Sequence, residues 1–148
     1  MSAEENARFA HTVYDAFNRG DLDAVIAMAD PEIDVVNVPW RDKFHGRAEF
    51  RIYLEGWKEM DPAASVEIVH QLAGDEGVVN ECIFRAPHVG MLSSPSGALT
   101  PTGKTLEVPF CEVWRIRNGK LLGLTNYADG VSIMEQLGVM PATAHSGA

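Results

Sequence analysis

The first 60 residues place apolar side chains at helical spacing, interrupted by one short strand-like run. This spacing predicts a long amphipathic helix over residues 3–19, a short helix that follows the cap residue Asp21, and a third helix over residues 46–60. Residues 33–38 read as a strand, and Pro39 ends it. We therefore expect a helix hairpin, then a strand, then a third helix that packs beside them.

From residue 66 onward the hydrophobic period changes from helical spacing to two. Alternation predicts two antiparallel hairpins, the first formed by residues 66–73 and 78–89, the second by residues 106–117 and 120–128. In the second hairpin, Asn118-Gly119 favours a two-residue type I′ turn.

Two further segments complete the chain. The Pro/Gly/Ser-rich segment 91–104 between the hairpins shows no periodicity and is predicted to be a loop that could act as a lid. A short last helix is expected over residues 131–137.

Helices that come first and an antiparallel meander that follows indicate the α+β class. A chain of 148 residues with 46% hydrophobic content has the size of one globular domain. We expect that domain to cover residues 1–140, and we expect residues 141–148 to be a disordered tail.

Charge and composition exclude several partners. The formal net charge of −9 comes from scattered acidic residues without a Lys/Arg cluster, so nucleic acid and anionic membranes are poor partners. Cys82 and Cys111 lack the spacing of a zinc site, which indicates free thiols in a reducing cytoplasm. No signal peptide, membrane span, phosphate-binding glycine loop or metal triad is visible, so we expect no cofactor and no metal.

The Asn118-Gly119 turn also predicts the register of the last hairpin. If Arg117 faces Lys120, then Cys111 lies opposite Asn126 and Glu112 lies opposite Thr125. One face of the hairpin would carry Glu112, Trp114 and Tyr127, and the other would carry Cys111, Leu124 and Asn126. Both faces are too apolar to be simply solvated, and the pattern alone does not say which face meets the helices.

Several segments together resemble the SnoaL-like polyketide cyclases and ester cyclases of the nuclear-transport-factor-2-like superfamily. The resemblance covers roughly residues 4–139 and is carried by the element order and by the segments HVG, PTGK, FCEVWRIRNGK, NYAD and EQLG. It implies a cone-shaped, curved, mostly antiparallel sheet with the N-terminal helices packed on its concave face. It also implies a homodimer through the outer sheet face, with Cys111 and Asn126 pointing inward and Glu112 an ion-paired residue of the interface.

The resemblance implies two candidates for proton transfer. Asp129 matches an aspartate that follows the last strand in these families, although it also stands where an N-cap of the last helix is expected. His88 matches the histidine of the family's His-x-Gly segment, and the alternative is a surface histidine or one that anchors the loop.

The remaining candidates would bind substrate. Asn37 and Asn126 could orient a polar group in an apolar pocket, or each could bond to nearby backbone instead. The expected pocket wall consists of aromatic side chains and one thiol: Tyr14, Phe17, Trp40, Trp57, Phe84 and Cys111.

Two activities of distant relatives find no support. Limonene epoxide hydrolase needs an Asp-Arg-Asp set, and the best-aligned positions hold Cys82, Phe84 and Asn126; the aspartate pair of ketosteroid isomerase finds no match either. The leading hypothesis is a cofactor-independent cyclase, isomerase or lyase that acts by proton transfer on a small apolar carbonyl metabolite. The alternatives are a non-catalytic binding module and a dimeric scaffold.

Overall fold

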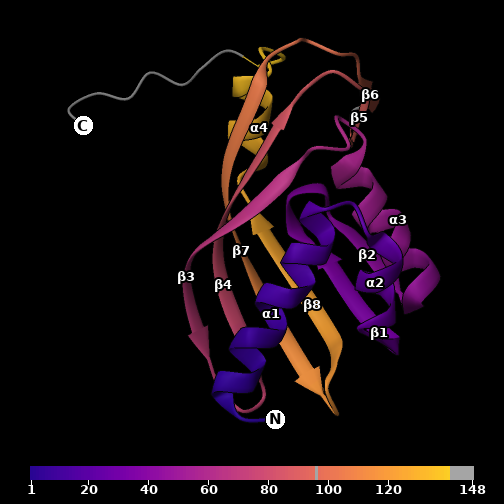
Figure 1. The fold of residues 1–148 in the computed structure, drawn as a ribbon. Coiled ribbons are helices and arrows are strands. Elements are labelled where there is room, and N and C mark those ends of the chain that lie inside the picture. Colours follow the sequence, from indigo (N-terminus) through magenta and orange to yellow (C-terminus); the bar gives the residue numbers. More distant parts are fainter. Residues whose placement is uncertain (96, 141–148) are drawn as a thin grey trace.

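The computed structural model describes residues 1–95 and 97–140 of the chain (Figure 1). Its main feature is a six-stranded curved sheet in the order β2-β1-β8-β7-β4-β3. The strands are β1 (Ala29–Asn37), β2 (Asp42–His45), β3 (Ser65–Ala73), β4 (Gly77–Pro87), β7 (Thr105–Arg117) and β8 (Lys120–Ala128). The predicted tail at residues 141–148 lies outside the described residues.

All neighbouring strands of this sheet are antiparallel except β1 and β8, which are parallel. The parallel pair joins the N-terminal half of the chain to the last strand. It places Asn37 beside Asn126, although 88 residues separate them in sequence. The α+β fold with a mostly antiparallel sheet is therefore confirmed.

Local sequence signals define the helices. Ser2 caps α1 (Ala3–Asn18) by accepting a hydrogen bond from the Glu5 N–H, and Asp21 caps α2 (Leu22–Ala27) in the same way through Ala24. The third helix is α3 (Gly46–Lys58), and α4 (Gly130–Gln136) follows β8. A single 3₁₀ turn, η1 (Val38–Trp40), ends β1.

The N-terminal helices cover one side of the sheet (Figure 1). Helix α1 crosses in front of the long strands and contacts β3 and β4, while α3 packs against β1 and β2. Between the helices and the sheet lies the main core, which includes Val13, Phe17, Phe50, Leu54 and Trp114. The predicted arrangement, with helices on the concave face, is confirmed.

The segment predicted as a loop without structure contains a small hairpin. Its strands are β5 (Leu92–Ser94) and β6 (Gly97–Leu99). Leu92 packs into a second core cluster with Leu106 and Leu137, which ties the segment to the sheet and to the end of α4. This hairpin was not predicted, because each strand is only three residues long and the segment is rich in Pro, Gly and Ser.

The predicted register of the last hairpin is wrong beyond its first two pairs. Arg117 faces Lys120 as predicted, and Asn118 and Gly119 both have positive φ, as a type I′ turn requires. A one-residue bulge at Leu122 then shifts the pairing, so Glu112 lies opposite Asn126 instead of Thr125. Because a shift of one residue exchanges the two faces of a strand pair, the faces predicted for β7 are reversed relative to β8.

Candidate functional site

Each strand of the six-stranded sheet contributes one polar side chain to a single row that crosses the sheet. In sheet order the row consists of Asp42, Asn37, Asn126, Glu112, Asn80 and Gln71. The four central members are almost fully buried, with exposed fractions of 0–4%. Buried polar side chains are costly unless they are hydrogen-bonded, so this row concentrates the polar chemistry of an otherwise apolar interior.

Glu112 stands at the centre of the row and is held by two tyrosines from two different helices. Tyr14 of α1 donates a short hydrogen bond to Oε1, and Tyr53 of α3 donates to Oε2 at 2.9 Å. Asn126 in turn donates from Nδ2 to the Tyr53 hydroxyl oxygen at 2.9 Å. The helices and the sheet are thus joined by one hydrogen-bond network around a single carboxyl group.

Burial governs the electrostatics of this network. The pKa of Glu112 is raised above its ordinary value because burial disfavours the charged carboxylate, and the hydrogen bonds from Tyr14 and Tyr53 oppose this effect only in part. Burial, followed by the proximity of Glu112, also raises the pKa of both tyrosines well above 10.0. The tyrosines therefore stay protonated and donate their hydroxyl hydrogens to Glu112, whose own pKa is raised by burial.

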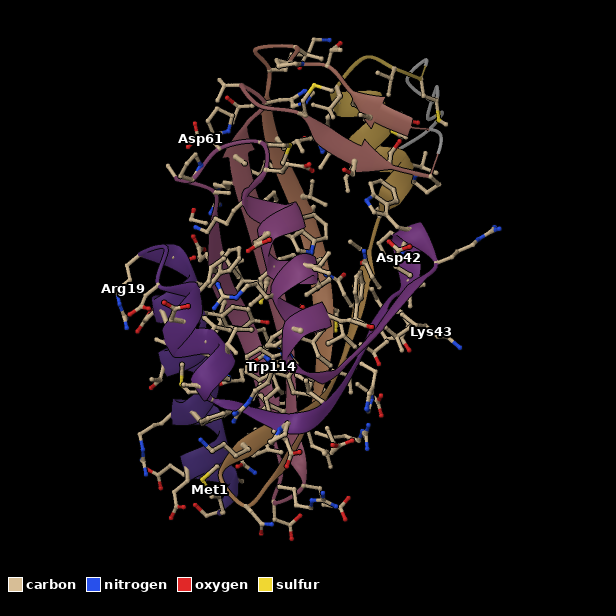
Figure 2. The ribbon with its side chains drawn as sticks, turned by 90° about the vertical axis from the view of Figure 1, so that its right-hand side faces the viewer. Met1, Arg19, Asp42, Lys43, Asp61 and Trp114 are labelled. Carbon is tan, nitrogen blue, oxygen red and sulfur yellow. The ribbon has the colours of Figure 1, made fainter. Side chains whose placement is uncertain are left out.

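Around Glu112 lies a small cavity of about 50 Å³. Its lining comes from α1, α2, α3 and the inner faces of the strands and is almost wholly apolar. Its only polar side chains are Tyr14, Tyr53, Glu112, Asn126 and the indoles of Trp57 and Trp114, and no Lys, Arg or His lines it in the part of the chain that the structure describes. Figure 2 shows Trp114 inside the body of the molecule. A carboxyl group in such surroundings has no cation to stabilise its charge.

Beside this cavity is a larger cleft of about 580 Å³. Its walls come from the end of β1, η1, β2, the outer part of α3 and β5: Asn37, Trp40, Asp42, Phe44, Ile52, Tyr53, Glu55, Gly56, Trp57, Glu59, Leu92 and Ser93. Tyr53 and Trp57 line both spaces. These two side chains therefore form the partition between the cleft and the Glu112 cavity.

Two buried amide oxygens, one bordering the cleft and one bordering the cavity, have no hydrogen-bond partner among the described residues. Asn37 Oδ1 and Asn126 Oδ1 are both buried and accept no hydrogen bond from any residue that the structure describes. Asn37 lines the cleft and Asn126 lines the cavity, on adjacent strands. Since an unsatisfied buried acceptor costs about 1–3 kcal/mol, the pair is suited to a bound molecule that carries hydrogen-bond donors.

The structure places Asp129 outside both spaces. Its carboxylate accepts a hydrogen bond from the Ser132 N–H at 3.0 Å and so caps α4. The residue is exposed and lines neither the cavity nor the cleft. Of the two interpretations that the sequence offered, the geometry matches the N-cap.

His88 is fully buried near the start of the segment that carries β5 and β6. Its Nδ1 lies 3.0 Å from Thr102 Oγ1, and its backbone N–H and C=O bond to Lys104 and Gly103. It lines neither the cavity nor the cleft. This geometry matches the loop-anchoring alternative.

The other candidates divide between the two spaces. Tyr14, Phe17, Phe84 and Asn126 line the cavity, Asn37 and Trp40 line the cleft, and Trp57 lines both. Cys111 does neither, because the bulge turns it to the outer face of β7. The prediction that Cys111 points inward is therefore wrong.

Sequence reasoning missed Glu112 and Tyr53. Glu112 was expected at a subunit interface, and Tyr53 was not among the expected site residues. The available signal was a single carboxylate in the middle of an apolar strand that alternates inward and outward residues. Because the predicted register was wrong by one residue, Glu112 was assigned to the outer face of β7 instead of the inner face.

The described residues contain neither a metal-binding cluster nor a membrane-spanning helix. Residues 1–95 and 97–140 contain no group of three or more His, Cys, Asp or Glu side chains placed to hold a metal ion. In the same part of the chain, no helix has the length and apolar character of a membrane-spanning segment.

Solved structures with the same fold are numerous, and three illustrate them. AclR, a candidate hydroxylase from Streptomyces galilaeus, is 21% identical, with a TM-score of 0.82 over 97% of this chain and 87% of that one. A candidate SnoaL-like polyketide cyclase from Jannaschia sp. CCS1 is 13% identical, with a TM-score of 0.82 over 94% and 95%. A protein from Catenulispora acidiphila with a ketosteroid isomerase-like fold, solved with trimethylamine, is 15% identical, with a TM-score of 0.72 over 88% and 92%.

Identities this low establish the fold alone. Among curated proteins the chain finds no match. The family model for the SnoaL-like domain, however, matches residues 10–123, which span α1 to β8 and include Tyr14, Tyr53 and Glu112. The chain belongs to the SnoaL-like domain family.

Proposed function

We propose that this protein is a cofactor-independent enzyme of the cyclase, isomerase or lyase type, in which Glu112 transfers a proton on a small apolar carbonyl compound. One observation carries the proposal: a carboxyl group is buried in an apolar cavity, with a raised pKa and hydrogen bonds from two tyrosines in place of a cation. Acids and bases whose pKa values are moved toward neutrality are typical of sites for proton transfer.

In this mechanism the Glu112 carboxylate removes a proton from the carbon next to the substrate carbonyl. Each carboxylate oxygen has two lone pairs, so Glu112 keeps acceptor capacity beyond the hydrogen bonds from Tyr14 and Tyr53. The protonated carboxyl then returns the proton to another atom of the same substrate. No net charge enters or leaves the cavity during this cycle, which suits a site without cations.

The size of the cavity limits what can enter it. A volume of about 50 Å³ holds a few water molecules at most, whereas pockets for drug-sized ligands span roughly 300–1,000 Å³. Only the reacting end of the substrate therefore enters the Glu112 cavity. The remainder lies in the cleft of about 580 Å³, past the partition formed by Tyr53 and Trp57.

Hydrogen–deuterium exchange tests the proposal without knowledge of the natural substrate. A panel of small ketones, esters and lactones is incubated with the protein in D₂O, and loss of the proton signal next to the carbonyl is followed by NMR. We expect exchange of at least one compound, slowed about 100-fold or more in Glu112→Gln, as for a lost general base. Tyr127→Phe, a change at an exposed tyrosine outside the cavity, is the matched control. Exchange at an unchanged rate in Glu112→Gln would contradict the proposal.

The second candidate is a non-catalytic binding module, and the small volume of the cavity favours it. In that case the aromatic side chains around Glu112 would fill the interior, and the cleft alone would hold a ligand. A compound that copurifies unchanged, together with no exchange across the whole panel, would support this alternative.

We also propose a homodimer through the outer face of the sheet. Strands β3, β7 and β8 expose apolar side chains there: Leu72 is 61% exposed, Val113 39% and Tyr127 53%. A second copy would remove these side chains from water. Light scattering should give the mass of a dimer, and Val113→Glu with Tyr127→Glu should give a monomer; a monomeric wild-type chain would contradict this.

A reducing cytoplasm fits the state of the two cysteines. Cys82 is 1% exposed, and burial raises the pKa of its thiol to about 12, so it is inert as a nucleophile. Cys82 points inward from β4 and Cys111 points outward from β7, so the two thiols do not form a disulfide. We propose the cytoplasm as the location on this basis.

A further inference from the structure

We infer that the molecule bound at this site carries an organic cation, a protonated amine on an apolar body, whose charged end lies in the cleft beside α3. This inference rests on the proposed function, since it names the substrate class for the same site. Three independent features of the cleft support it: its charge, its aromatic walls and an unpartnered acceptor.

The charged side chains that line the cleft are all acidic. Asp42, Glu55 and Glu59 line it, and no Lys, Arg or His does so within the described ranges. Asp42 and Glu55 form no ion pair with any residue that the structure describes, whereas Glu59 accepts hydrogen bonds from the backbone N–H and hydroxyl of Ser93, at 3.1 and 3.3 Å. Three carboxylates with one sign of charge attract a cation and repel an anion over a distance of roughly 10 Å at 0.1 M salt.

Lys43, the residue after Asp42 in the sequence, does not neutralise this cleft. Lys43 follows Asp42 on β2, and successive side chains of a strand point to opposite faces. Asp42 and Phe44 therefore face the cleft while Lys43 points away from it, as its outward side chain shows in Figure 2.

The walls of the cleft are aromatic. Trp40, Phe44, Tyr53 and Trp57 all line it, and the rings of Tyr53 lie 5.7 Å from Phe44 and 6.4 Å from Trp57, centroid to centroid. Ring faces attract cations, by about 0.5–1 kcal/mol at exposed sites and about 2 kcal/mol when desolvated. An alkylammonium group thus gains from the same walls that receive its apolar body.

Asn37 adds a specific polar contact. Its Oδ1 is buried and unpartnered, the residue is 4% exposed, and it borders the cleft next to Asp42 across the strand pair. An amide oxygen accepts hydrogen bonds, so it matches the N–H of a protonated amine and is mismatched with a carboxylate or a phosphate. A neutral hydroxyl would satisfy Asn37 but would gain no charge–charge attraction from the three carboxylates.

The test compares three probes of the same size and different charge: benzylamine, benzyl alcohol and benzoate, all at pH 7. Binding is measured by calorimetry and by the fluorescence of the tryptophans. We expect benzylamine to bind at least 10-fold more tightly than benzyl alcohol, and benzoate not to bind. Benzylamine affinity should fall at least 5-fold in Asp42→Asn with Glu55→Gln. It should be unchanged in Asp75→Asn with Glu76→Gln, a pair that removes the same charge from an exposed turn outside the cleft.

Equal affinity for benzylamine and benzyl alcohol would overturn the inference, and so would a loss of affinity that is the same in both double variants. Glu112→Gln separates this inference from the proposed function. Benzylamine binding that persists in Glu112→Gln, without proton exchange in the wild type, supports the cation site and contradicts the enzyme. Proton exchange in the wild type with no preference for the amine contradicts the cation site alone.

Discussion

Two carboxyl groups, one in the β7–β8 hairpin and one directly after it, lie in opposite environments. Glu112, in the middle of β7, is 4% exposed and receives hydrogen bonds from Tyr14 and Tyr53. Asp129, directly after β8, is exposed and accepts a hydrogen bond from the backbone of Ser132. The same functional group is therefore a desolvated acid in one place and a helix cap in the other.

The difference shows that position relative to the helices, more than residue type, decides the chemistry. The apolar cavity around Glu112 lets burial dominate its pKa, because no cation lies within it. Asp129 is exposed and caps α4, so it lies outside the apolar interior that surrounds Glu112. The following variants test this difference at Glu112, at Asp129 and at an exposed carboxylate.

The largest effect is expected for Glu112→Ala. Removal of the carboxyl group leaves the buried hydroxyls of Tyr14 and Tyr53 without an acceptor, at about 1–3 kcal/mol for each. We expect the free energy of unfolding, from urea denaturation, to fall by about 2–5 kcal/mol. Glu112→Gln, which keeps an acceptor oxygen, should lose less than half of that. Equal stability of Glu112→Ala and wild type would contradict the network.

The second effect concerns pH. Since the folded state raises the pKa of Glu112 above 4.5, the folded chain binds more protons than the unfolded chain between those two pKa values. The stability contributed by this residue is therefore full below pH 4.5 and is lost as the pH rises through the folded pKa. Relative to Glu112→Gln, the wild type should lose about 1.4 kcal/mol for each pH unit of that window. A difference between the two proteins that does not vary with pH would contradict the raised pKa.

A smaller effect is expected at the other carboxyl group. Asp129→Ala removes the N-cap of α4 and should lower stability by about 1 kcal/mol. Asp129→Asn keeps a capping oxygen and should be nearly neutral. Neither variant should slow the deuterium exchange that Glu112→Gln slows. A slowing of 10-fold or more in Asp129→Asn would give Asp129 the role that we assign to Glu112.

The smallest effect is expected for the pKa of His45, which lies beside the exposed carboxylates of Asp34 and Glu32. The hydrogen bond from His45 Nδ1 to Asp34, 2.8 Å long, raises the pKa of His45 above 6.5, and Glu32 contributes less. A raised pKa of a histidine means that its contribution to stability is full below pH 6.5 and is lost as the pH rises through the folded pKa. NMR titration should show this pKa falling in Asp34→Asn and unchanged in Glu112→Gln.

The architecture could be predicted from the sequence because it depends on local signals. Helical spacing, the caps Asp21 and Asp129 and the Asn118-Gly119 turn all indicate elements that the structure contains. The small hairpin of β5 and β6 and the short strand β2 were not predicted, because runs of three or four residues show no clear period.

The site could be predicted only in part because it depends on register. The bulge at Leu122 has no signature in the hydrophobic pattern, yet it exchanges the faces of β7 and brings Glu112 to the interior. The parallel pairing that sets Asn37 beside Asn126 is a tertiary contact between distant segments. Asn37, Asn126 and most of the aromatic candidates line one of the two spaces, and their role in binding substrate stays a prediction.

The most direct test of the central claim is the titration of Glu112 itself. The protein is labelled with ¹³C at the glutamate side-chain carboxyl, and the Glu112 resonance is assigned as the one absent from Glu112→Gln. We predict a pKa clearly above 4.5 and above that of every exposed glutamate in the same spectra. A Glu112 carboxyl that titrates at or below 4.5 would contradict the account, because burial in this cavity would then not prepare it to hold a proton.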